Sequence, residues 1–92
     1  MVITERTDCT LVVQKESSND AGQRSFVEYS EAFGKEVKIF NRKETGNIFT
    51  VKTAKESLFS DNFIILYFDK VPEEYQVGTK VGIIIGKIMW LV

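Results

Sequence analysis

The segment 36–53 constrains the fold more than any other part of the chain, because it contains two alternating runs joined by a turn. EVKIFNRK and NIFTVKT both alternate apolar and polar residues with a period of two, which is typical of strands with one buried face. The loop between them, ETG at 44–46, has glycine where a three-residue hairpin loop needs a left-handed backbone. The sequence therefore predicts an antiparallel hairpin in which Lys43 lies opposite Asn47.

This register decides which side chains of the hairpin share a face. Ile39 is predicted to point into the core, and Phe40 is predicted to lie on the other face, opposite Thr50. Lys38 is predicted to lie directly opposite Lys52 on the same face as Phe40. Two like charges in such a pair destabilise a hairpin slightly, so a nearby carboxylate from another strand, or an anionic partner, is expected.

The rest of the chain also has a period of two rather than 3.6. The nine polar residues 16–24 predict a loop. Six consecutive apolar residues within 61–70 predict a central strand covered on both faces. The other expected elements are a strand over 9–15, a short helical turn within 53–60, a proline-initiated turn over 71–78 and a long strand over 79–92.

The segment 25–34 is compatible with a strand or a helix. Ser25 and Glu28 have the spacing of a helix-capping box, and Gly34 lies where a helix would end. Phe26 and Tyr29 are good strand formers, and an isolated helix this short is marginal. The residues favour the strand by a small margin, and both alternatives stay open.

Together these elements predict a mainly β fold of five to seven strands with one or two short helical turns. The short connections favour antiparallel pairing, and the interior glycines Gly82 and Gly86 favour strands that bend. We therefore expect a small antiparallel barrel or sandwich, the size of oligonucleotide-binding or SH3-like barrels. With 92 residues, the chain fits one domain, 1–92.

The composition argues against catalysis. The chain has no histidine and one cysteine, which removes the commonest general base and the usual zinc ligands. Cys9, followed by Leu-Val-Val, is predicted to be a small buried hydrophobe. Adjacent Glu73 and Glu74 are explained by favourable charge at the start of a turn. We therefore expect no enzyme activity, no cofactor and no metal.

The N-terminal residues mix charges of both signs, and the longest apolar stretch is too short to cross a bilayer as a helix. One cysteine indicates a reducing compartment, so a cytoplasmic protein without a membrane partner is expected. The small size would fit a phage or plasmid product.

Charge is unevenly distributed around a net value of −1. Residues 1–34 have a net charge of −3, residues 35–55 of +4, and residues 56–92 of −2. An aromatic side chain among cations can stack a nucleic-acid base or anchor a protein interface. The predicted binding residues in this basic segment are Lys38, Phe40, Arg42, Lys43, Ile48 and Lys52. In the alternative, the 54–59 turn or the chain end covers Phe40 and the lysines lie at its rim. The sequence leaves both alternatives open.

The C-terminal strand ends in apolar residues with no polar tail. Such a strand must be covered, paired in a sheet or paired with another subunit. The sequence therefore predicts a homo-oligomer, a two-fold dimer, with Ile88, Trp90 and Val92 in its interface.

Two hypotheses follow for function. The first is a non-enzymatic protein that acts through protein–protein contact, as an adaptor, an inhibitor or an assembly subunit. The second is a barrel that binds single-stranded nucleic acid through the basic hairpin 35–55. Nothing in the sequence identifies the partner.

Overall fold

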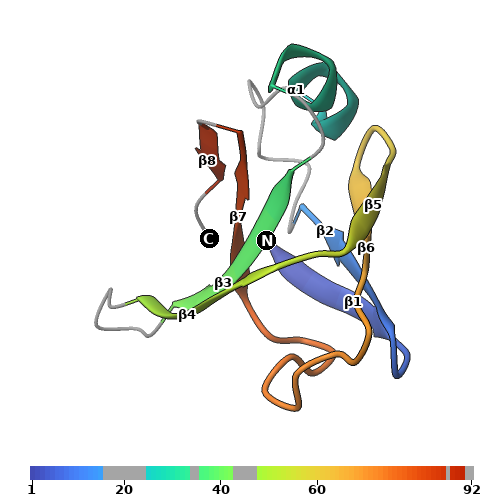
Figure 1. Ribbon diagram of the computed structural model, residues 1–92, viewed down its shortest axis with the longest axis vertical. Coiled ribbons are helices and arrows are strands. Elements are labelled where there is room, and N and C mark those ends of the chain that lie inside the picture. Colours follow the sequence, from blue (N-terminus) through green and yellow to red (C-terminus); the bar gives the residue numbers. More distant parts are fainter. Residues whose placement is uncertain (16–24, 34–35, 43–47, 87, 91–92) are drawn as a thin grey trace.

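The computed structural model describes residues 1–15, 25–33, 36–42, 48–86 and 88–90 (Figure 1). These residues form one helix and two four-stranded antiparallel sheets, which do not close into a barrel. Sheet I has the order β1-β2-β6-β5, and sheet II has the order β4-β3-β7-β8. The elements are β1 (Val2–Arg6), β2 (Thr10–Gln14), α1 (Phe26–Phe33), β3 (Val37–Arg42), β4 (Ile48–Thr53), β5 (Glu56–Phe59), β6 (Phe63–Tyr67), β7 (Val81–Ile85) and β8 (Ile88–Trp90).

The mainly β, antiparallel prediction is confirmed, although the described residues form eight strands rather than five to seven and some elements need correction. The helical turn expected within 53–60 is wrong, because residues 56–59 form β5, which pairs with β6. The long strand expected over 79–92 is divided: Gly86 has a φ of 58°, and β8 folds back onto β7. A left-handed glycine allows this tight reversal, whereas residues with a Cβ resist it.

The helix α1 replaces the strand that the sequence slightly favoured over 25–34. Its N-terminus is held by a reciprocal capping box: Ser25 N donates to Glu28 Oε2 (3.1 Å), and Glu28 N donates to Ser25 Oγ (3.4 Å). Phe26 is fully buried and Tyr29 packs against the core. This packing supplies the stability that so short a helix lacks by itself.

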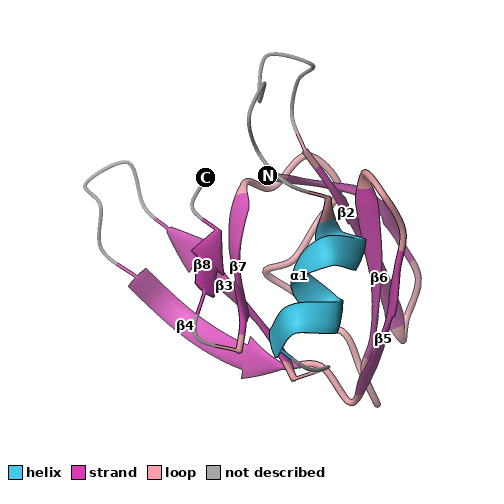
Figure 2. Cartoon of the chain, turned by 90° about the horizontal axis from the view of Figure 1, so that it is seen from above, coloured by secondary structure: helices cyan, strands magenta, loops and turns pink. Residues whose placement is uncertain are grey.

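The core lies between the sheets, and α1 lies across one end of them (Figure 1 and Figure 2). In sheet I, paired residues share a face, so the inner face carries a row of Ile3, Val13, Ile64 and Phe59. Sheet II contributes Val37, Ile39, Val81, Ile83 and Ile85, all buried.

The chain passes between the sheets at the short link from β4 to β5, seen in Figure 1 as one nearly continuous path. Ala54 N donates to Val37 O of sheet II (3.0 Å), and Lys55 N donates to Tyr67 O of sheet I (2.8 Å). Elsewhere, Ile3 N of β1 donates to Thr79 O just before β7 (3.0 Å). The two sheets are therefore joined by the continuous chain at the β4–β5 link, and by backbone hydrogen bonds between the β1 region and the start of β7.

The hairpin register differs from the prediction at its centre. Lys38 pairs with Thr53 and Phe40 with Val51, and the predicted register returns only at Arg42 and Ile48. A β-bulge between these positions shifts the alignment by one residue. The predicted Lys38–Lys52 pair is therefore wrong, and the bulge removes the like-charge contact.

Cys9 is also corrected, since it is exposed rather than buried. β2 begins at Thr10, and Cys9 lies in the turn that precedes it. In that turn, Thr7 Oγ1 accepts a hydrogen bond from Thr10 N (3.0 Å) and from Cys9 N (3.3 Å). The tight turn keeps the thiol outside the sheet.

Candidate functional site

The predicted basic surface is only partly assembled. Lys52 is exposed, and Lys38 has 41% of its side chain exposed. Lys38 Nζ lies 3.5 Å from Glu36 Oε1, a carboxylate just before the start of its own strand rather than on another strand or a partner. Lys43 and the side chains of Arg42 and Ile48 lie outside the part that the structure describes.

Phe40 cannot present its ring to a partner in this structure. It is fully buried, although it does lie on the face opposite the core, as predicted. It pairs with Gly82 of β7, and its ring occupies the space that a Cβ at position 82 would need. Phe40 is therefore a packing residue, which corresponds to the alternative in which another part of the chain covers it rather than to an exposed aromatic anchor.

The predicted oligomer interface is described only at the level of the backbone. Ile88 pairs with Ile85, and Trp90 pairs with Ile83, so β8 is joined to β7 within the same chain. The side chains of Ile88 and Trp90, and all of Val92, lie outside the described residues.

The structure reveals a second surface, the outer face of sheet I, which is mostly apolar. One row crosses all four strands: Glu5 pairs with Val12, Val12 with Ile65, and Ile65 with Leu58. On one side of this row lies a second row of Val2, Gln14 and Phe63. On the other side lies a third row of Thr10, Tyr67 and Glu56. The six apolar residues of the outer face are Val2, Val12, Leu58, Phe63, Ile65 and Tyr67.

No described element covers this face. α1 contacts β5 and β7 at one end of the two sheets and does not lie over the outer face of sheet I (Figure 1 and Figure 2). The partly buried apolar residues that pack against the core are Tyr29, Ala54, Phe59 and Phe68, and none belongs to the outer face. Leu58 is 54% exposed, and its five apolar neighbours are partly exposed. A contiguous apolar patch of this kind is typical of a binding surface.

The charged groups on the outer face are both acidic. Glu5 and Glu56 are exposed, and they lie on the two edge strands, β1 and β5. Asp61 and Asp69, also exposed, flank the ends of β6. Asp69 Oδ1 is 3.3 Å from Lys55 Nζ. The outer face therefore combines an apolar centre with a negative edge.

Sequence reasoning missed this surface because it expected β6 to be covered on both faces. β6 is central, as predicted, but only Ile64 and Leu66 are buried. The signal was present in the sequence, because both the odd and the even positions of 63–67 are apolar. It could not show which of the two faces would be left open.

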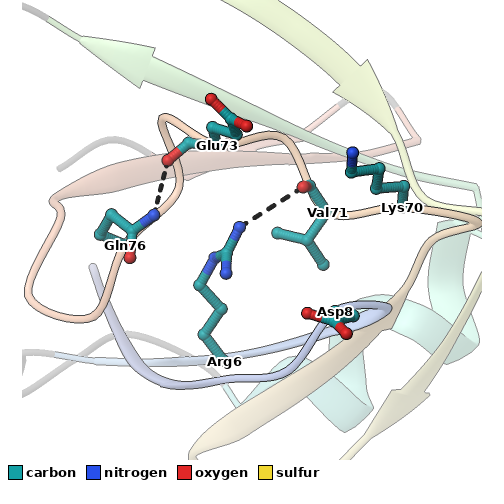
Figure 3. A pocket seen from close by; sticks show the side chains of 6 residues that line it. All are labelled: Arg6, Asp8, Lys70, Val71, Glu73 and Gln76. Carbon is teal, nitrogen blue, oxygen red and sulfur yellow. Dashed lines mark hydrogen bonds between the residues drawn. The ribbon is translucent and has the colours of Figure 1, made fainter.

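An open pocket of about 470 Å³ lies on the other side of β1, between the β1–β2 turn and the 70–76 loop (Figure 3). Arg6 crosses it: Nε donates to Tyr75 O (2.7 Å), and Nη2 donates to Val71 O and Pro72 O (both 3.4 Å). Gln76 Nε2 donates to Glu73 O (2.7 Å) within the loop. These contacts fix the loop, so we assign the pocket a structural role.

No protein-family model, curated protein or solved structure matches this chain. Within the described residues, no group of three or more histidine, cysteine, aspartate or glutamate side chains is placed to hold a metal ion. The one described helix is too short to span a membrane.

Proposed function

We propose that this protein is a non-enzymatic binding protein that acts through protein–protein contact at the outer face of sheet I. The observation that carries the proposal is the apolar row from Val12 through Ile65 to the exposed Leu58. Aromatic side chains, here Phe63 and Tyr67, are the residues most enriched in protein interfaces. An adaptor, an inhibitor and an assembly subunit all need such a surface and no catalytic group.

The competing hypothesis, binding of single-stranded nucleic acid, has weaker support. Stacking of bases needs exposed aromatic rings close to cations. Phe40, which lies near the cations, is buried. Phe63 and Tyr67, which are partly exposed, share their face with Glu5 and Glu56, whose carboxylates repel phosphate.

Site-specific photo-crosslinking tests the proposal directly. A photoreactive amino acid would be placed at Leu58, and separately at Val77, in protein produced in its native host. Val77 is a matched control because it is apolar and 60% exposed but lies outside sheet I. We expect a discrete protein adduct from position 58 and none from position 77. Equal capture from both positions, or none from position 58, would contradict the proposed surface.

Nucleic-acid binding is tested with a labelled single strand and fluorescence anisotropy at low and moderate salt. Phosphate contacts release counterions, so such binding would weaken steeply as salt increases. We expect no salt-dependent binding at micromolar protein. Salt-sensitive binding that is lost in Lys52→Glu would favour the competing hypothesis instead.

A further inference from the structure

We propose that the outer face of sheet I binds a basic amphipathic helix of a partner protein, with the helix axis running along β2 and β6. This inference rests on the proposed function, because it names the kind of partner that the same surface takes. It starts from three properties of the face: an apolar centre, carboxylates at both edges, and a surface made of side chains alone.

The apolar centre of the face lies on the two inner strands, β2 and β6. Val12 pairs with Ile65, and Phe63 and Tyr67 lie on the same face of β6, one row away in each direction. Leu58 of β5, 54% exposed, extends this centre beyond β6. β6 has five residues, so it is about 17 Å long, a length that about eleven residues of a helix cover. The apolar centre therefore matches about three helical turns.

Two carboxylates lie at opposite edges of this centre, Glu5 on β1 and Glu56 on β5. At a strand spacing of about 4.8 Å, the two edge strands lie about 14 Å apart. A helix with its side chains is about 10–12 Å wide, so a helix over β2 and β6 fits between them. Glu56 lies one row from Glu5, about 7 Å along the strands and little more than one helical turn. Lysine or arginine side chains on both flanks of the helix therefore reach the two carboxylates.

The chain does not neutralise these carboxylates itself. Neither Glu5 nor Glu56 forms an ion pair with another described residue. The cations adjacent to them in the sequence are engaged with other groups: Arg6 binds carbonyl oxygens of the 70–76 loop, and Lys55 pairs with Asp69. A cationic partner therefore supplies the complementary charge.

The construction of the face favours a helix over other elements. The N–H and C=O groups of a sheet pair with the neighbouring strands, so side chains alone form its face. An isolated strand laid on this face would bury its own backbone groups without partners, which is unfavourable. A helix bonds its backbone internally and presents only side chains. The outer face of a second copy is rejected on charge, because it brings carboxylates towards carboxylates.

A synthetic peptide of about fourteen residues tests this chemistry. It carries leucine at helical spacing on one face, lysine on both flanks and alanine elsewhere, with blocked ends and a fluorescent label. Binding to the purified full chain is measured by fluorescence anisotropy in low salt. We expect the peptide to bind at micromolar protein and to gain helical circular dichroism when bound. It should bind about tenfold or more tightly than the same peptide with glutamate in place of lysine.

A lysine peptide with a central proline tests the helix itself. Proline breaks a helix but keeps the charge and the leucines. This peptide should bind about tenfold more weakly than its parent.

Variants of the protein locate the binding on the outer face. Glu56→Lys and Leu58→Ser are each expected to weaken binding of the lysine peptide about fivefold or more. Glu74→Lys is the matched control for charge, and Val77→Ser is the matched control for an exposed apolar residue, since both positions are exposed and lie outside sheet I. Both controls should bind as the wild type does. Urea unfolding of every variant confirms that the fold is retained.

The proposal is overturned if the lysine peptide does not bind, if the lysine and glutamate peptides bind alike, or if the proline peptide binds as well as its parent. It is also overturned if Glu56→Lys and Glu74→Lys have the same effect. These outcomes are separate from the test of the proposed function. A discrete adduct from position 58 in the host, together with a failed peptide test, keeps the binding surface and rejects the basic helix as its partner. Selective binding of the lysine peptide without an adduct from position 58 contradicts the proposed function but supports the specificity of the face.

Discussion

The ring of Phe40 on β3 lies against the backbone of Gly82 on β7, in the space that a side chain at position 82 would fill. The two residues are paired across the sheet, and both are buried. Gly82 is thus required by packing: its φ is not in the left-handed region, and its missing Cβ makes room for the ring.

Gly82→Ala should therefore destabilise the protein by about 1–3 kcal/mol, the usual effect of overpacking a core. Urea unfolding monitored by tryptophan fluorescence measures the change. The same substitution made together with Phe40→Leu should have a smaller effect, because the shorter side chain leaves room for the methyl group. Equal effects in both backgrounds would show that the ring and the glycine are not in contact.

Phe40→Ala is expected to lower the free energy of unfolding by about 3–5 kcal/mol, as truncation of a buried phenylalanine does. Lys52→Ala, on the neighbouring strand, is exposed and should change it by less than about 0.5 kcal/mol. A small effect of Phe40→Ala would mean that the ring is exposed in solution, and would restore the sequence prediction of a surface aromatic.

The hairpin shows how far sequence reasoning can reach here. Alternation correctly placed Ile39 inward and Phe40 on the opposite face, because a period of two is a local property of a strand. The pairing of Lys38 was wrong because the bulge depends on how β4 meets β3, which the turn residues do not determine. Burial of Phe40 was one of two open alternatives, and the sequence could not decide between them because the contact with Gly82 joins residues distant in the sequence.

The candidate surface illustrates the same limit. The apolar run in β6 predicted a central strand, and β6 is central. The outer face needs Val12, Ile65 and Leu58 from three strands, and their alignment is a property of the sheet. Leu58 lies within 53–60, where a short helical turn was expected. Pairing with β6 makes its segment a strand instead.

Arg6 supports a further prediction, because its guanidinium binds three carbonyl oxygens of the loop that follows β6. Arg6→Met keeps much of the apolar stem and removes these bonds. It should lower the free energy of unfolding by about 1.5–3 kcal/mol, the range for hydrogen bonds with a charged partner.

Hydrogen exchange should report the same change locally, with faster exchange of the Val71 and Tyr75 amides, which bond to Asp8 O and Pro72 O. Lys70→Met is the control, since Lys70 is exposed and also lines the pocket. If the Val71 and Tyr75 amides exchange at the same rates in Arg6→Met and Lys70→Met, the hydrogen bonds of Arg6 do not hold the loop.

Cys9 should react fully with a thiol reagent in the folded protein, because it is free and exposed. We expect Ellman's reagent to detect one thiol per chain, and to react with it at a rate close to that in the urea-unfolded protein. A buried thiol, as the sequence predicted, would react only as fast as the protein opens. Slow labelling that accelerates in urea would contradict the exposed turn.

The capping box of α1 gives a last prediction. Ser25→Ala removes the hydroxyl that accepts a hydrogen bond from Glu28 N, and should destabilise the protein by about 0.5–2 kcal/mol. Ser30→Ala, in the same helix, is the matched control: Ser30 Oγ donates to Val27 O, and alanine is the better helix former. Ser30→Ala should therefore be neutral or slightly stabilising. Urea unfolding of the two variants measures the difference, and an equal effect would mean that the box does not fix the start of the helix.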